Sequence, residues 1–349
     1  MPKRKTKSVV EMPLEATAVD GLKKFLNDSI GFSMPSRWFL DSGNLALNYV
    51  MSGRLDGGYI SGSTCEFFGD PATGKTLLLM KAAAAAQKRD MVVCIADAEN
   101  RWDDDFAAVQ GVDPDGVALY YPETVEEFAV KGYEIITEVV KDKSMLLILD
   151  SMAILSTLKE MEDIKDGDIK ADQGRKAQKI HAAMRTLRTE LRRTNSILLV
   201  SNHVIANPGS YVQSSSAPGG KAVPFQSNIR LELTKPTTIN LPDKNIPIGV
   251  TIHVYVAKNS VFVPFGQCDM NLYWNTGVDR NSGLLDLMVD LEIIQRTGAW
   301  YYYREEAFQS TKFGAFLETH PEMLADVKWE RPYFLGGIKS ESTTTKETT

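Results

Sequence analysis

The chain has 349 residues, of which 43% are hydrophobic and 24% are charged, close to the averages of globular proteins. This composition excludes a mainly disordered, collagen-like or coiled-coil chain, and the length predicts one large core with smaller additions. With 39 basic and 45 acidic side chains the net charge is −6, so a nucleic-acid site must be a local patch rather than the whole surface.

Apolar runs and cysteines indicate the cellular setting. No apolar run approaches the roughly 18 residues that a membrane span needs, and the basic start lacks an apolar stretch long enough for a signal peptide. Cys65, Cys94 and Cys268 are too few and too widely spaced for a disulfide framework or a Cys-rich zinc site. We therefore expect a cytoplasmic protein without a membrane partner.

Residues 1–40 are expected to form a leader that contains one short helix. Leu22, Phe25 and Leu26 mark an apolar face, which is typical of an amphipathic helix over residues 20–30. Such a helix can pack on its own core or dock on a neighbouring subunit, and the sequence favours neither.

Strands and helices alternate along residues 41–225. Helices are predicted at 77–89, 124–141 and 171–194, and strands at 64–69, 91–99, 145–150 and 196–202. The strands are nearly continuous apolar runs, which is typical of a mostly parallel sheet covered by helices on both faces.

The pattern changes after residue 225. The segments IRLELTK, VTIHVYVAK and SVFVPF follow one another as predicted strands, which favours antiparallel additions at a sheet edge. The core is therefore expected to span 41–282. A small helical lobe is predicted at 283–334, in which Trp300 and Tyr301–Tyr303 suit either a core or a surface that guides duplex DNA, and a disordered tail at 335–349.

The strongest motif is the run Gly69-Asp70-Pro71-Ala72-Thr73-Gly74-Lys75-Thr76, which matches G-x-x-x-x-G-K-[ST] in full. It follows a predicted strand and opens a predicted helix, as a phosphate-binding loop requires. Glycines let the backbone approach a phosphate closely, and successive N–H groups then point at the anion. We expect Lys75 to reach the β- and γ-phosphates and the Thr76 hydroxyl to bind Mg²⁺.

Two acidic residues at predicted strand ends complete this site. Asp150 ends the strand MLLILD and is predicted to hold Mg²⁺ together with Thr76. Hydrolysis also needs a group that orients or deprotonates water. Glu99, at the end of MVVCIADAE, is the candidate, and Asp97 on the same predicted strand is the alternative.

The order of these features resembles that of the RecA-type recombinases, including those of bacteriophages, over about residues 39–330. The matching segments are the phosphate loop, IADAE, LLILDS, LLVSNH, APGGKAVPF, AKNSVFVPF and RTGAWYYY. The resemblance implies a RecA-like ATPase core of α/β class with a mostly parallel central sheet, antiparallel edge strands, an N-terminal helical arm and a small C-terminal lobe. It implies ATP as the nucleotide, with Mg²⁺.

The resemblance also assigns roles to single residues. It implies that Glu99 activates the attacking water, that Asp103 and Phe106 contact the adenine, and that His203 senses the γ-phosphate and couples it to DNA. Lys258 and Phe225 are implied to contact ATP across a subunit boundary.

Two positions depart from the family at that boundary. Ser260 stands where the second lysine of a pair is expected, and Pro224 stands where a basic residue often precedes the phenylalanine. The boundary contacts are therefore expected to be fewer, with Arg230 or Lys221 as replacement charges.

Two DNA-binding loops are implied, near 158–172 and 204–219. The first holds three lysines and six acidic residues within 159–172, which suits phosphate poorly. Arg185 on the following helix is implied to contact DNA, and the second loop offers backbone and side-chain groups at Asn207, Gly209, Ser210, Tyr211 and Gln213.

Taken together, the resemblance implies a DNA-dependent ATPase. It would form helical filaments on single-stranded DNA and catalyse pairing and strand exchange with a homologous duplex in recombination and repair. Its partners would be both DNA forms, further copies of the chain, and single-strand-binding and loader proteins. Two alternatives stay open: a ring helicase on the same core, and a nucleotide-binding mediator without strand exchange.

Overall fold

The computed structural model describes residues 20–22, 36–139, 143–167, 173–203 and 222–328. The chain divides after Ser36 into two compact units. Residues 20–22 of the first unit are helical, while the rest of the predicted helix at 20–30 and the predicted tail at 335–349 lie outside the described residues. Within the described ranges, no helix is both long and apolar enough to cross a membrane.

The second unit is built on a nine-stranded sheet with the strand order β11-β10-β9-β8-β3-β7-β6-β4-β5. The strands are β3 (Ser63–Gly69), β4 (Val92–Asp97), β5 (Val117–Tyr120), β6 (Met145–Asp150), β7 (Ile197–His203), β8 (Ile229–Asn240), β9 (Pro247–Asn259), β10 (Gln267–Tyr273) and β11 (Gly277–Val278). Strands β5, β4, β6, β7, β3 and β8 pair in parallel, and β9 to β11 are added antiparallel. The predicted mostly parallel sheet with antiparallel edge strands is confirmed.

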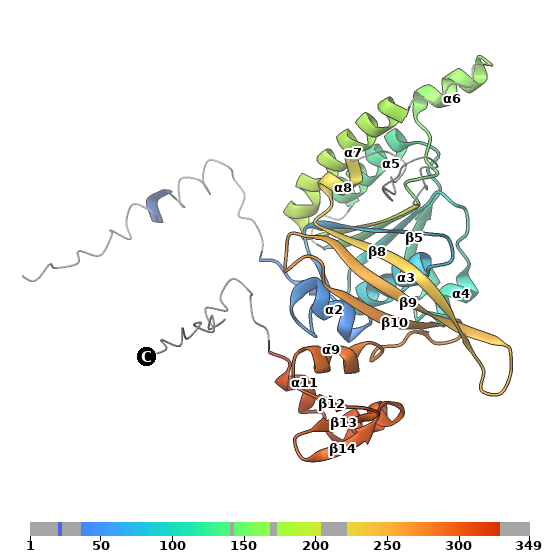
Figure 1. Ribbon diagram of the computed structural model, residues 1–349. Helices are drawn as coiled ribbons and strands as arrows, with labels where there is room; N and C mark the ends of the chain where they lie inside the picture. The colour runs from blue at the N-terminus through green and yellow to red at the C-terminus, as the bar shows by residue number, and fades with distance from the viewer. Residues whose placement is uncertain (1–19, 23–35, 140–142, 168–172, 204–221, 329–349) are drawn as a thin grey trace, which may run out of the picture. The chain divides into compact units, whose positions relative to one another are not determined.

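Helices cover both faces of this sheet (Figure 1). One face carries α2 (Leu45–Ser52), α3 (Lys75–Lys88) and α4 (Asp104–Val109), and the other carries α5 (Val125–Glu134), α7 (Gln173–Thr194) and α8 (Ala222–Gln226). Strand β6 is apolar from Met145 to Leu149 because both of its faces are covered. Leu146 and Ile148 pack toward the α3 side, while Leu147 and Leu149 pack toward the α7 side, because successive side chains of a strand point to opposite faces.

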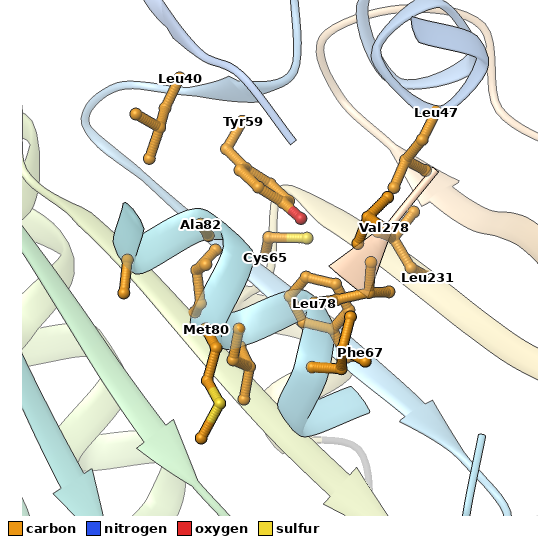
Figure 2. Close-up of a cluster of buried hydrophobic side chains, with 14 of the residues drawn as sticks. Leu40, Leu47, Tyr59, Cys65, Phe67, Leu78, Met80, Ala82, Leu231 and Val278 are labelled. Carbon is orange, nitrogen blue, oxygen red and sulfur yellow. The ribbon is translucent and has the colours of Figure 1, made fainter. Parts of the chain in front are cut away.

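The core beneath α3 fixes the start of that helix (Figure 2). Phe67 of β3 and Leu78 of α3 are fully buried in it, and Tyr59 packs edge-on against Phe67 with ring centroids 5.9 Å apart. Tyr59 belongs to the short pair β1 (Phe39–Leu40) and β2 (Tyr59–Ile60). Because α3 packs against β3, the two ends of the loop between them are held in place.

The predicted strand SVFVPF is a turn between β9 and β10. The side-chain oxygen of Asn259 accepts the N–H groups of Val261 and Phe262 at 2.8 and 3.0 Å, which ends β9. Phe265 then adopts a left-handed backbone conformation, with φ 74°, and its N–H donates to the carbonyl oxygen of Val256 at 2.8 Å. The apolar composition of this segment hid the turn, because its reversal depends on one asparagine side chain.

The C-terminal part contains helices α9 (Leu284–Asp290), α10 (Phe313–Thr319) and α11 (Met323–Asp326), as predicted, and a three-stranded antiparallel sheet that was not predicted. Its strands are β12 (Gln295–Thr297), β13 (Trp300–Tyr303) and β14 (Glu306–Gln309). Tyr301 and Tyr303 are buried in the core of this lobe, whereas Trp300 is exposed. The two tyrosines are therefore core residues.

The remaining elements are single helical turns or short helices between these. They are the 3₁₀ turns Pro114–Gly116 and Ser310–Lys312, the π-helical Ile135–Val139 that continues α5, and α6 (Leu158–Lys165). Figure 1 shows α6 projecting beyond α5 and α7. The three cysteines are free and buried, which agrees with the prediction that they form no disulfide framework.

Candidate nucleotide-binding site

The predicted site residues meet at one edge of the sheet. Strands β3, β7, β6 and β4 are adjacent and parallel, so their carboxyl ends share an edge. The register places Gly69 opposite His203 and Asp97 opposite Asp150. Four segments that are distant in sequence therefore end side by side, which is where ligands bind in open α/β sheets.

The phosphate loop needs its two glycines for steric reasons. Gly69 has φ 147° and Gly74 has φ 80°, and a Cβ atom would lie 2.1 Å from the carbonyl oxygen of Leu233 at the first position and 2.2 Å from the side chain of Leu272 at the second. Glycine is therefore required at both positions, which give the loop the backbone angles that it has before α3.

Lys75 is directed into this loop. Its side chain is buried, and Nζ donates to the carbonyl oxygens of Gly69 and Asp70 at 3.0 and 2.7 Å. Burial lowers the pKa of Lys75, and the nearby carboxylates of Asp150 and Glu99 oppose that shift. An ammonium group held at the loop mouth is placed to bind a phosphate oxygen.

Thr76 and Asp150 form a candidate Mg²⁺ site. The Thr76 hydroxyl donates to Oδ2 of Asp150 at 2.7 Å, and the Ser201 hydroxyl donates to Oδ1. Burial raises the pKa of Asp150, and a bound cation would oppose that shift. One hydroxyl and one carboxylate beside a phosphate loop fit Mg²⁺, which keeps several waters and takes phosphate oxygens as ligands. Among the described residues, no cluster of three or more His, Cys, Asp or Glu side chains offers a closed metal cage.

The prediction that Glu99 ends a strand is wrong, because Glu99 lies in the turn after β4. The strand ends at Asp97, whose buried carboxylate accepts the N–H groups of Arg101 and Trp102 at 2.7 and 2.8 Å and so reverses the chain. The backbone N–H of Glu99 donates to the carbonyl oxygen of Asp150 at 3.2 Å. Asp97, the alternative base, is thus occupied with the backbone of the turn.

The Glu99 carboxylate has a cationic or hydrogen-bonding partner on each oxygen. Oε1 is 2.8 Å from Nε2 of His203, Oε2 is 2.9 Å from Nη1 of Arg101, and the side chain is only 7% exposed. Burial raises the pKa of Glu99, but the His203 hydrogen bond, the Ser151 hydroxyl and the Arg101 charge together outweigh burial and hold the pKa below its ordinary value. The carboxylate is therefore ionised at neutral pH and able to accept a proton from water.

These residues line a cleft of about 330 Å³. Its wall includes Pro71–Leu77, from the phosphate loop and the start of α3, together with Glu99, Arg101, Phe106, Asp150, His203 and Trp274. Asp103 is the N-cap of α4 and accepts the N–H of Phe106 at 2.7 Å, so its carboxylate also has a structural task. Its predicted adenine contact remains a prediction.

Arg101 and Trp274 line the cleft but were not identified from the sequence. Arg101 carried a weak signal, as a basic residue two positions beyond the candidate base. Trp274 lies between β10 and β11, where its N–H donates to Ile248 at 3.0 Å. Trp274 lines the cleft where the distant segments α3 and β11 contact each other, so no local pattern pointed to it.

The predicted subunit-boundary residues lie together on α8 and β9. Nζ of Lys258 donates to the carbonyl oxygens of Pro224 and Phe225 at 2.9 and 3.0 Å, and Phe225 is 68% exposed. Ser260 donates its backbone N–H and its hydroxyl to the carbonyl oxygen of Asn228, at 2.9 and 3.0 Å. Ser260 thus has a local task, and the contact across a boundary stays a prediction.

Arg230, one of the expected replacement charges, is already paired. Its Nε is 2.5 Å from Oε2 of Glu66, which is fully buried, and its guanidinium lies over the Phe68 ring at 4.2 Å. The second oxygen of Glu66 accepts from Asn202 at 3.1 Å. The charge of Arg230 is therefore balanced within the chain, and Lys221 lies outside the described residues.

The predicted DNA-binding segments are only partly described. The segment expected as the first loop begins with helix α6, which has a capping box between Thr157 and Glu160. Arg185 is exposed on α7 and makes no ion pair within the described part of the chain. The remaining predicted contacts lie outside the described residues: Asn207, Gly209, Ser210, Tyr211 and Gln213.

A phosphate loop between a strand and a helix, with acidic residues at neighbouring strand ends, defines a phosphate-loop nucleotide-binding core. The family models then identify its branch: the RecA N-terminal domain matches residues 37–279, and the RecA C-terminal domain matches residues 282–330. The chain belongs to the RecA family, as its resemblance predicted.

Curated relatives agree with this assignment. Protein RecA of Levilactobacillus brevis is 30% identical over 319 residues, covering 88% of this chain and 82% of the relative. Protein RecA of Acholeplasma laidlawii is 30% identical over 294 residues, covering 83% and 85%. Protein RecA of Lactobacillus delbrueckii subsp. bulgaricus is 31% identical over 313 residues, covering 88% and 80%.

Proposed function

We propose that this protein is a DNA-dependent ATPase that forms filaments on single-stranded DNA and catalyses homologous pairing and strand exchange in recombination and repair. Family membership supports DNA recombination as the process. The observation that carries the ATPase is the buried Glu99 carboxylate, in contact with His203 and lining the same cleft as Lys75 and Thr76.

The residues divide the chemistry among them. The loop N–H groups and Lys75 bind the β- and γ-phosphates, while Glu99 accepts a proton from the water that attacks the γ-phosphorus. The bond between the γ-phosphorus and the oxygen that bridges it to the β-phosphate breaks, and the products are ADP and phosphate. Mg²⁺, held by Thr76 and Asp150, supplies positive charge against the phosphate oxygens when bound. Lys75 adds to that charge on the protein side.

His203 is the proposed connection between nucleotide and DNA. It is the last residue of β7, and the predicted second DNA-binding loop begins directly after it. Its ring contacts Glu99 at 2.8 Å and lines the cleft beside Lys75. A ring that turns between the carboxylate and a phosphate would move with the backbone of the loop that follows it.

Assembly follows from sharing the nucleotide between subunits. We place Lys258 and Phe225 against the ATP of a neighbouring subunit, since Phe225 is exposed and half-buried Lys258 contacts its backbone. A ligand that binds only the assembled state favours assembly, so ATP would stabilise the filament. Hydrolysis of that ATP would then allow the subunits to separate. We also propose that the chain divides into a leader (1–40), a core (41–282), a lobe (283–334) and a tail (335–349). Single-strand-binding and loader proteins are proposed as further partners.

Electron microscopy with single-stranded DNA, Mg²⁺ and a slowly hydrolysed ATP analogue tests the proposal. Continuous helical filaments that are absent without nucleotide are the expected result. Closed rings would point to the helicase instead. Isolated particles on DNA would point to the mediator, and the departures at Ser260 and Pro224 would then explain the lost assembly.

Trp274 gives a separate test of the cleft as an ATP site. Stacking of a base on an aromatic ring is worth about 1–3 kcal/mol, so Trp274→Ala is expected to weaken ATP binding by roughly fivefold to a hundredfold. Binding of inorganic tripolyphosphate, which has no base, should change little. Trp300→Ala, an exposed tryptophan of the C-terminal lobe, is the matched control. Equal losses for both ligands would place Trp274 away from the base.

A further inference from the structure

Arg101 contacts the candidate base from the turn after β4. Its Nη1 is 2.9 Å from Oε2 of Glu99, on the oxygen that His203 does not contact. The Arg101 side chain is 75% exposed, whereas that of Glu99 is 7% exposed. A buried carboxylate is thus held at one oxygen by a cation that reaches in from the cleft.

Arg101 and His203 are anchored differently. Arg101 donates its backbone N–H to buried Asp97 at 2.7 Å, and the next residue, Trp102, donates to the same oxygen at 2.8 Å. Arg101 is therefore fixed to the turn that carries Glu99 itself. His203 comes from a different strand and precedes the predicted DNA-binding loop.

We propose that Arg101 is a positioning residue that holds Oε2 of Glu99, so that Oε1, the oxygen now shared with His203, accepts the proton of the attacking water. This inference rests on the proposed ATPase function. When His203 turns toward a phosphate, Oε1 becomes available, and Arg101 keeps the carboxylate in its plane.

A second fixed contact matters because the terminal torsion of a glutamate side chain is broad and weakly restricted. Without Arg101, the carboxylate would lose its charged contact when His203 left it, and it would be freer to rotate. A displacement of a reacting group by about 1 Å can cost about a hundredfold in rate. The exposure of the guanidinium moderates the expected loss, because water screens the pair.

Arg101 also lines the cleft beside the phosphate loop, which suggests a competing role as a direct phosphate ligand. The two roles differ in their kinetics. A phosphate ligand present before the reaction would raise KM for ATP, whereas a residue that orients the base would lower kcat and leave KM nearly unchanged.

The test measures kcat and KM for ATP, with saturating single-stranded DNA and Mg²⁺, in Arg101→Ala and Arg101→Lys. We expect Arg101→Ala to lower kcat by roughly tenfold while KM stays within about twofold. Arg101→Lys should recover part of kcat, since an ammonium group can bond the same oxygen. Arg54→Ala removes an exposed arginine that pairs with Asp56 outside the cleft and should change neither constant.

A double-mutant cycle separates action through Glu99 from other effects. In a Glu99→Gln background, Arg101→Ala should alter the residual rate by less than about twofold, because the base that it positions is gone. A raised KM with normal kcat, a raised kcat, or a tenfold loss that persists in the Glu99→Gln background would each overturn the proposal. Absence of DNA-stimulated hydrolysis in the unmodified protein would instead overturn the proposed function, on which this inference depends.

Discussion

Replacement of Lys75 by alanine is expected to abolish tight ATP binding and hydrolysis. The ammonium group is buried at the loop mouth, where its hydrogen-bond partners among the described residues are carbonyl and hydroxyl oxygens, and a bound phosphate would be its charged partner. Removing one member of a buried, hydrogen-bonded charge pair costs about 2–5 kcal/mol, which corresponds to at least about thirtyfold weaker binding. Calorimetric titration with ATP and Mg²⁺ measures this loss directly, and a phosphate-release assay measures hydrolysis.

Lys88→Ala provides the control for this change. Lys88 lies in the last turn of the same helix, α3, and is exposed to solvent. It should retain full binding and turnover, and circular dichroism should show the same helix content in both variants. Near-normal turnover in Lys75→Ala would overturn the assignment of the phosphate loop.

The phosphate loop could be predicted because its requirements are local. Gly69 and Gly74 have backbone angles that suit glycine, and Lys75 and Thr76 begin the helix that follows. All of these demands fall within eight consecutive residues, so one short pattern contains them. The parallel strands were predicted for a similar reason, since burial on both faces gives a continuous apolar run.

The parts of the site that were missed depend on contacts between distant segments. Trp274 reaches the cleft from the turn between β10 and β11. Arg101 contacts Glu99 because the Asp97 carboxylate shapes the turn that carries both residues. Glu66 shows the same limit within a strand. A fully buried carboxylate in an apolar run is tolerated because Arg230 and Asn202, from β8 and β7, supply its partners.

These distant contacts also explain how the sheet edge holds its geometry. Glu66 joins β3, β7 and β8, and the backbone N–H of His203 donates to the Asn202 side chain at 3.1 Å. The strand that carries the phosphate loop is thereby fixed to the strand that ends in His203. The end of β7, from which His203 reaches Glu99, is thereby held by buried polar groups.

Glu99→Gln is expected to separate ATP binding from hydrolysis. Loss of a positioned general base typically lowers a rate by about 10²–10⁴-fold, because the amide cannot accept the proton of water. Lys75, Thr76 and Asp150 are unchanged, so ATP binding and filament assembly should persist. Single-turnover hydrolysis, measured beside electron microscopy of the same samples, reports both properties.

Glu190→Gln is the matched control for that variant, because Glu190 pairs with Arg193 on α7 and is not part of the cleft wall. It should hydrolyse ATP at the normal rate. A Glu99→Gln protein that failed to assemble would show that Glu99 has a structural role at the sheet edge. One that bound ATP, formed filaments and hydrolysed at the normal rate would move the search for the base to another group in the cleft. Filaments that form and then persist, because their ATP is not hydrolysed, are the result that the geometry around Glu99 predicts.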